Sequence, residues 1–133
     1  MGIINETGAK LALAGEEYRL LFTVNAIEKI EDEMGESIDS LPQYMYKTNK
    51  DGNVTGFKYS NVAKVLCILV NEAIEIREEN TKTELEHLTI EQIKRRISNA
   101  NIAMCTDAIA SAFSLSFLEK KDEDENPKKS SLR

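Results

Sequence analysis

Apolar residues near the start of the chain recur at every second position on either side of one glycine. The alternating positions are Leu11, Leu13, Tyr18, Leu20 and Phe22, with Ala14-Gly15-Glu16 between the two runs. A period of two is typical of β-strands with one covered face, and a glycine between two such runs is typical of a tight turn. The sequence therefore predicts a β-hairpin at about residues 9–22.

The period then changes to three or four residues, with charged side chains between the apolar ones. The apolar positions are Val24, Ile27, Ile30 and Met34. This spacing predicts an amphipathic helix over about residues 24–34. Thr23 or Asn25 can cap its start, and Gly35 is suited to a left-handed end.

The pattern is weaker over residues 37–58. Pro42 limits the segment 37–46 to a turn or a brief helix. Asp51-Gly52 lies in a polar loop between Tyr46 and Phe57, which predicts a second, irregular hairpin.

Three longer apolar patterns predict helices at about residues 60–79, 89–98 and 101–118. Ser60 and Thr89 are suited to the N-cap position, and Gln92 completes a capping-box spacing with Thr89. The polar connector between the first two helices, which ends near His87, is expected to be mobile.

Together these elements predict an α+β fold that is mostly α: an N-terminal β-hairpin followed by four or five helices, packed as one small domain over residues 1–118. A chain of 133 residues suffices for one hydrophobic core and is too short for two. From residue 119 onward the chain is polar, contains Pro127 and has no aliphatic residue before Leu132. Residues 119–133 are therefore predicted to form a disordered tail.

The charge balance limits the possible partners. The chain has 17 basic and 23 acidic residues, a net charge of −6, and the charges of the tail cancel. Because phosphate binding needs clustered Lys and Arg, we expect no general affinity for nucleic acid or for an anionic membrane. The most apolar stretch, residues 65–70, is far shorter than the roughly 20 residues needed to span a bilayer.

Residue types that carry chemistry are few. Two cysteines, Cys67 and Cys105, and one histidine, His87, cannot build a tetrahedral zinc site from Cys and His alone. Both cysteines lie in apolar helical patterns, as expected of buried free thiols, and His87 lies in a polar connector, as expected of a solvated side chain. We predict no catalytic residue, no cofactor and no metal site, and hence a protein that is not an enzyme.

The last helix is unusually apolar, with Asp107 as the only charge before Glu119. One stripe of it is a candidate partner-binding surface, formed by Ile102, Ile109, Phe113, Phe117 and Leu118. Together with the helix at 60–79, this is more apolar helix than a small domain readily covers. Either the two helices pack on each other, or part of their surface binds a partner or a second copy.

The hairpin pattern is followed at once by Phe22-x-x-Asn25-Ala26-Ile27 and by an acidic helix that ends at Met34-Gly35. Later, Leu88-Thr89-Ile90-Glu91-Gln92-Ile93 leads into an Ala-rich helix. Over about residues 9–118, this order of features resembles the tail assembly chaperones of long-tailed, siphovirus-like bacteriophages and prophages.

The resemblance implies a non-enzymatic chaperone that binds the tape measure protein and helps to recruit tail tube subunits, often as a homo-oligomer. It implies action in the cytoplasm of the bacterial host, absence from the mature virion, and a possible origin as the short product of a frameshifted gene. Two other classes stay open. One is a structural head–tail or tail component of the virion, and the other is a small helical regulator that binds nucleic acid through Lys94, Arg95 and Arg96.

Overall fold

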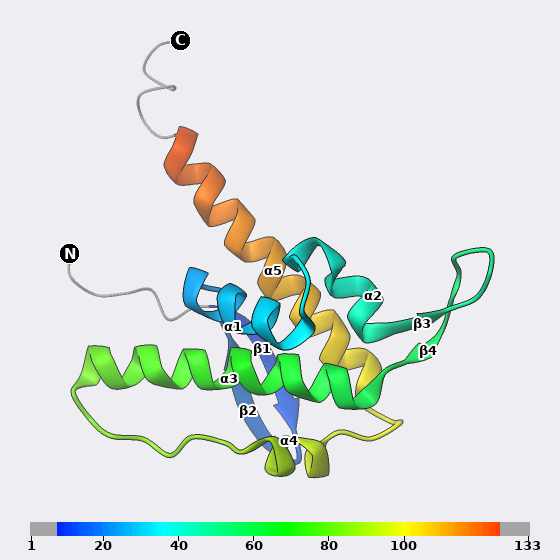
Figure 1. Cartoon of the computed structure of the whole chain (residues 1–133). Coiled ribbons are helices and arrows are strands. Elements are labelled where there is room, and N and C mark those ends of the chain that lie inside the picture. Colours follow the sequence, from blue (N-terminus) through cyan, green and yellow to red (C-terminus); the bar gives the residue numbers. More distant parts are fainter. Residues whose placement is uncertain (1–7, 126–133) are drawn as a thin grey trace.

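The computed structural model describes residues 8–125, and for residues 117–125 it describes the course of the backbone alone. Two strands open the chain, and helices follow with a second small hairpin between them (Figure 1). The elements are β1 (Ala9–Leu13), β2 (Glu16–Leu20), α1 (Val24–Met34), η1 (Ile38–Ser40), α2 (Leu41–Met45), β3 (Tyr46–Thr48), β4 (Val54–Phe57), α3 (Tyr59–Thr81), α4 (Ile90–Arg96) and α5 (Ile102–Glu125). The predicted α+β, mostly α fold with an N-terminal hairpin is confirmed.

The hairpin β1–β2 is antiparallel, with Leu13 opposite Glu16 next to the turn. The two turn residues, Ala14 and Gly15, have positive φ angles of 51° and 81°. A two-residue turn of this kind matches the right-handed twist of the strands. The apolar face of the hairpin is buried, because β2 packs on α3 and β1 packs on α5.

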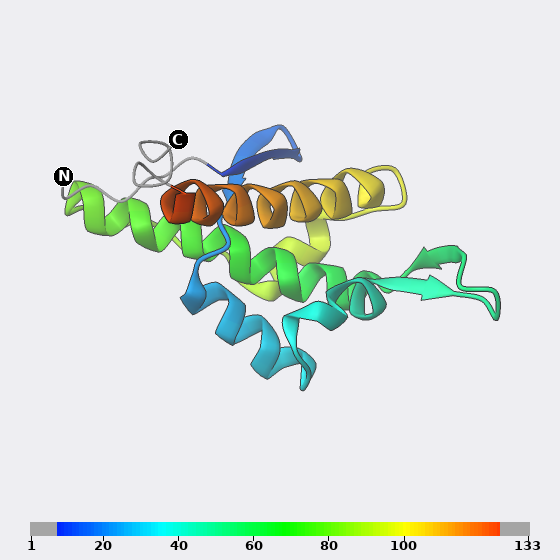
Figure 2. The same ribbon diagram turned by 90° about the horizontal axis from the view of Figure 1, so that it is seen from above.

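Helix α3 is the centre of the molecule. The hairpin and α1, α2, α4 and α5 all pack against it (Figures 1 and 2). Its buried apolar residues lie on more than one side of the helix: Val62, Ala63, Val65, Leu66, Leu69, Val70, Ala73 and Ile76. The wide apolar surface of this helix is therefore used within the molecule.

The ends of the helices follow local capping rules in two cases and depart from them in one. Thr23 caps α1, Gly35 ends it with φ 75°, and Thr89 with Gln92 forms the capping box of α4, all as predicted. Ser60 is not an N-cap, because α3 begins one residue earlier and Lys58 precedes it without a side-chain cap. The packing of α3 on its neighbours determines where the helix begins, and the capping tendency of Ser60 does not override it.

Helix α5 is longer than the sequence pattern indicates. It continues to Glu125, so the first seven residues of the segment predicted as a disordered tail belong to this helix. Glu and Lys are good helix formers, and the next proline after residue 118 comes only at position 127, so nothing local stops the helix at residue 118. Figure 1 shows the C-terminal part of α5 reaching beyond the other elements. Residues 126–133 lie outside the described residues.

The second hairpin is also confirmed. Tyr46 is opposite Phe57, and the register shifts between Lys47 and Thr48, so the pairing is irregular as predicted. This hairpin projects from the helical body (Figure 2).

Candidate partner-binding surface

The stripe of α5 predicted to bind a partner faces the interior of this structure. Ile102 is 3% exposed and Ile109 is fully buried. Phe113 is half-buried and meets Phe22 edge to face, with ring centroids 5.2 Å apart. The side chains of Phe117 and Leu118 lie outside the described residues. Ile102 and Ile109 thus offer no exposed surface, because both belong to the hydrophobic core.

The opposite side of α5 is exposed and carries little charge. We define the α5 outer face by its exposed residues between positions 103 and 115: Ala103, Met104, Asp107, Ala110, Ser111, Ser114 and Leu115. Met104 is 48% exposed and Leu115 is 38% exposed. Asp107 is the one charged residue on this face. The described part of α5 therefore presents small and apolar side chains to the solvent.

The motif Phe22-x-x-Asn25-Ala26 fastens α1 to α3. The Thr23 hydroxyl accepts a hydrogen bond from the Ala26 amide at 3.0 Å and donates one to Glu72 Oε2 at 2.5 Å. Asn25 Nδ2 donates to Glu72 Oε1 at 2.9 Å. Glu72 is 6% exposed, and Ala26 is fully buried. The roles that the structure gives to this motif are capping and packing.

Glu72 was not singled out from the sequence, although one signal was present. It lies among the apolar residues of α3, where a carboxylate is costly unless it accepts hydrogen bonds. Its two donors come from a segment almost fifty residues away, which periodicity along one helix does not reveal.

The connector between α3 and α4, predicted to be mobile, is hydrogen-bonded to α3 at two points. Asn71 on α3 donates to the Leu88 carbonyl at 2.8 Å and accepts from the Leu88 amide at 2.9 Å. Glu78 accepts from the Leu85 amide at 2.7 Å and pairs with His87 Nε2 at 2.9 Å. His87 is thus exposed, as expected, but bonded to a carboxylate.

These bonds also change the acidity of Glu78. The hydrogen bond from the Leu85 amide, and after it the bond from His87, hold the pKa of Glu78 below its ordinary value. Both contacts stabilise the ionised carboxylate.

The three basic residues of α4, at positions 94–96, differ in exposure. Lys94 and Arg95 are exposed. Arg96 is half-buried, and its Nη1 donates to the Gln92 carbonyl of its own helix at 2.8 Å. The three cations therefore do not form one continuous exposed patch.

Both cysteines are free thiols, Cys105 buried and Cys67 half-buried. Burial raises the pKa of Cys105 to about 11 and raises the pKa of Cys67 as well. At neutral pH both are protonated, and a protonated thiol is a weak nucleophile.

Two findings concern metals and membranes. Among residues 8–116, whose side chains the structure describes, no three His, Cys, Asp or Glu gather where they could hold a metal ion. None of the helices among residues 8–125 is both long enough and apolar enough to cross a bilayer.

Comparison with protein-family models, curated proteins and solved structures finds no match.

Proposed function

We propose that this chain is a non-enzymatic tail assembly chaperone of a long-tailed phage or prophage. Its α5 outer face would cover an apolar helical segment of the tape measure protein. The observation that carries the proposal is the exposure of this face, whose only charge is Asp107. The motif Phe22-x-x-Asn25-Ala26, through which the sequence resembles these chaperones, supports the same assignment.

The side chains of the α5 outer face suit contact with another helix. Ala103, Ala110 and Ser111 are small and allow a partner helix to approach closely. Met104 and Leu115 are eleven residues apart, which places them on the same side of α5, about 16 Å apart along its axis. The flexible Met104 side chain adapts to partners of varied shape. A helix-on-helix mode of recognition follows from this arrangement.

The same proposal places the protein at work in the host cytoplasm, before the tail is complete. There it would keep the tape measure protein from aggregating and help to recruit tail tube subunits. The net charge of −6 would help to keep such a complex in solution.

The test is co-expression with the tape measure protein of the same genome. We expect the two to co-purify, and we expect Met104→Glu with Leu115→Glu to reduce the co-purified amount about tenfold, since each change puts a charge into the contact. The matched control is Val24→Glu, because Val24 is 73% exposed and lies on α1. Equal loss with the control variant, or no co-purification of the unchanged pair, would contradict the proposal.

A second measurement separates the chaperone from a structural component of the virion. Mass spectrometry of purified virions should not detect the chain, since an assembly chaperone leaves before the particle is finished. Its presence at a fixed copy number would support the structural class instead.

A further inference from the structure

The hairpin β3–β4 ends in an arm that lies outside the core. We define the arm as residues 47–55, all nine of which are exposed. It projects from the helical body in both views (Figures 1 and 2). A two-stranded hairpin is only marginally stable by itself, so the arm adds little to the stability of the fold. Its surface is available for contact with another molecule.

The turn of the arm is held in place by its own hydrogen bonds. The side-chain oxygen of Asn49 accepts hydrogen bonds from the amide of Asp51, at 2.9 Å, and from the amide of Asn53, at 3.0 Å. The Gly52 amide donates to the Asn49 carbonyl at 3.0 Å. The arm is therefore ordered before it meets a partner, which lowers the entropic cost of binding.

The arm carries two lysines that are free to pair with a carboxylate. Lys47 and Lys50 are exposed, and among residues 8–116 neither ammonium group makes a hydrogen bond or an ion pair. Asp51 is the one carboxylate of the arm. Val54, on the second strand, is 57% exposed. The arm thus offers an apolar side chain and an excess of positive charge.

The outward side of α1 offers the opposite set. Val24, Glu28 and Asp32 follow one another at intervals of four residues, so they form one ridge of the helix, and all three are exposed. We call these three residues the α1 ridge. Within residues 8–116, neither carboxylate of the ridge has a partner, whereas Glu33 beside it pairs with Lys64 at 3.4 Å. The ridge therefore offers an apolar side chain and two free negative charges.

Charge and apolar exposure both select these two surfaces as a pair. Residues 24–39, which contain α1, include six acidic residues and one basic residue, while residues 46–58, which contain the arm, include three basic residues and one acidic residue. Val24, which is 73% exposed, and Val54 are the two most exposed large apolar side chains in the part of the chain whose side chains are described. The two surfaces are complementary in charge, and each has a valine that a partner can cover.

A single molecule cannot join its own arm to its own ridge. In both views the arm points away from α1, with α2 between them (Figures 1 and 2). The contact must therefore form between two copies. Because it joins unlike surfaces, a pair of copies still has one free arm and one free ridge, and further copies can add.

We propose that the arm of one copy binds the α1 ridge of a second copy, head to tail. Val54 would pack against Val24, and the two lysines of the arm would face the two carboxylates of the ridge. Both surfaces are small, so we expect a weak and reversible contact, which weakens further as salt screens the charges.

This proposal concerns surfaces different from the α5 outer face. The arm and the α1 ridge include no residue of that face, and Figure 2 shows α5 and α1 on either side of α3. The contact between copies therefore does not depend on the proposed chaperone function. Its test needs no tape measure protein, so the failure of one proposal is distinguishable from the failure of the other.

The test is sedimentation velocity of the full chain over a concentration series. We expect the average mass to rise with concentration and to fall when salt is added. Lys47→Glu with Lys50→Glu should weaken the association about tenfold, and so should Glu28→Lys with Asp32→Lys. The mass of a single chain at every concentration would overturn the proposal.

Mixing the two double variants tests the head-to-tail arrangement. The reversed arms of one variant fit the reversed ridges of the other, and the unchanged arms of the second fit the unchanged ridges of the first. The mixture should therefore associate about as strongly as the unchanged chain, although neither variant does so alone. A mixture that stays dissociated, or full association of Glu28→Lys with Asp32→Lys by itself, would contradict this arrangement.

Matched controls separate the contact from an effect of net charge. Lys10→Glu with Lys94→Glu makes the same change of charge as the arm variant, and Glu79→Lys with Glu84→Lys makes the same change as the ridge variant. All four positions are exposed and lie on other elements. Both controls should associate like the unchanged chain. Equal weakening by the controls would show that only net charge matters and would refute the site.

A measurement on the unchanged protein avoids any effect of the variants on folding. Dilution of a concentrated sample should shift the NMR amide signals of Lys50 and Val54 on the arm and of Glu28 on α1 most strongly. Shifts confined to the α5 outer face would overturn the proposal. A chain that stays single and instead binds single-stranded DNA through the lysines of the arm would overturn it as well.

Discussion

A single buried carboxylate, that of Glu72, determines how α1 sits on α3. It accepts hydrogen bonds from the Thr23 hydroxyl and the Asn25 amide, and Thr23 at the same time caps α1. The N-terminus of α1, which carries a partial positive charge, therefore faces a carboxylate. The start of α1 is tied to the middle of the core through this one side chain.

Substitution of Glu72 should be costly in a graded way. Glu72→Ala removes the acceptor of two part-buried hydrogen bonds and should lower the free energy of unfolding by about 2–3 kcal/mol. Glu72→Gln keeps one acceptor oxygen and should lower it by about 1 kcal/mol. Urea denaturation measures both, with the exposed Glu79→Gln on the same helix as control. Equal effects of Glu72→Ala and Glu79→Gln would show that the network contributes nothing.

Glu78 should make the connector sensitive to acid. The pKa of Glu78 is lowered in the folded state, so the ionised form is the one that holds Leu85. This stabilisation is present above the ordinary value of 4.5 and is lost as the pH falls through the lower folded value. The protection factor of the Leu85 amide against hydrogen exchange should therefore fall as the pH is lowered through the folded pKa of Glu78, and Glu78→Gln should lower it at pH 7.

The connector contains its own control for this measurement. Leu88 is held by the uncharged Asn71 and should keep its protection over the same pH range. If Leu85 and Leu88 lose protection together, acid unfolds the whole molecule and Glu78 has no special part.

At the scale of elements, α1 is defined by signals close together in the sequence. Thr23 caps it, an apolar stripe buries it, and Gly35 ends it in a left-handed conformation with φ 75°. A Cβ atom at position 35 would meet nothing within 4 Å, so only the backbone conformation demands glycine there. Element boundaries of this kind can be read from the sequence.

Gly35→Ala should lower the free energy of unfolding by about 1 kcal/mol. The Cβ atom of alanine makes the left-handed conformation unfavourable, whereas glycine adopts it without strain. Gly56→Ala is the control: position 56 has no positive φ, and an added Cβ would make an ordinary contact of 3.6 Å with Lys47. Thermal unfolding of the two variants compares them. A Gly56→Ala variant less stable than Gly35→Ala would contradict the strain argument.

Elements that depend on distant contacts were harder to predict. Both hairpins, α1 and the capping box of α4 follow from local patterns and turn residues. The connector to α4 has a polar composition typical of a mobile loop, yet Asn71 and Glu78 hold it. Over residues 102–118 of α5 almost every residue is small or apolar, so periodicity identified the helix but did not show which side is buried.

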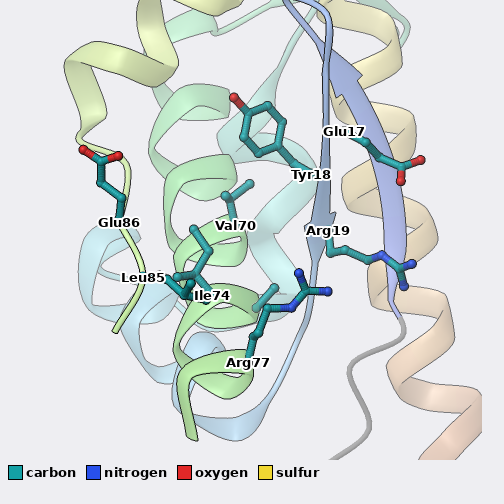
Figure 3. A pocket seen from close by; sticks show the side chains of 9 residues that line it. Glu17, Tyr18, Arg19, Val70, Ile74, Arg77, Leu85 and Glu86 are labelled. Atoms are coloured by element: carbon teal, nitrogen blue, oxygen red, sulfur yellow. The ribbon is translucent and has the colours of Figure 1, made fainter. Parts of the chain in front are cut away.

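The candidate site shows the same limit. The sequence identified α5 as the unusual helix, but the stripe it favoured, with Ile102 and Ile109, forms part of the core. The side left outside carries Met104 and Leu115, whose exposure follows from where the hairpin lies. The pocket between β2, α3 and the connector to α4 (Figure 3) could not be predicted, since the residues that line it come from three separate segments.

At the scale of the whole molecule, α5 closes the core, and Cys105 reports on its position. Cys105 is fully buried and its pKa is raised to about 11 by burial, so it should react with a thiol reagent only when α5 lifts. Phe113 on the same helix packs against Phe22. Phe113→Ala should weaken this attachment by about 2–3 kcal/mol and speed the labelling of Cys105 more than about tenfold at pH 8.

The experiment uses a Cys67→Ser background, so that Cys105 is the only thiol. Leu115→Ala on the exposed side of α5 is the matched control and should leave the labelling rate nearly unchanged. If both variants accelerated the labelling of Cys105 equally, α5 would expose this thiol by unfolding locally and not by detaching from the hairpin.

The packing of β1 on α5 has a consequence for synthesis of the chain. The strand at residues 9–13 leaves the ribosome before the helix that covers it, which begins about 90 residues later. Synthesis proceeds at roughly 5–20 residues per second, so the apolar face of the hairpin stays exposed for on the order of 5–18 s before α5 is made. During that interval the exposed apolar face makes the nascent chain itself a substrate for cellular chaperones. Any mutation that slows the docking of α5 lengthens the time in which the chain can aggregate.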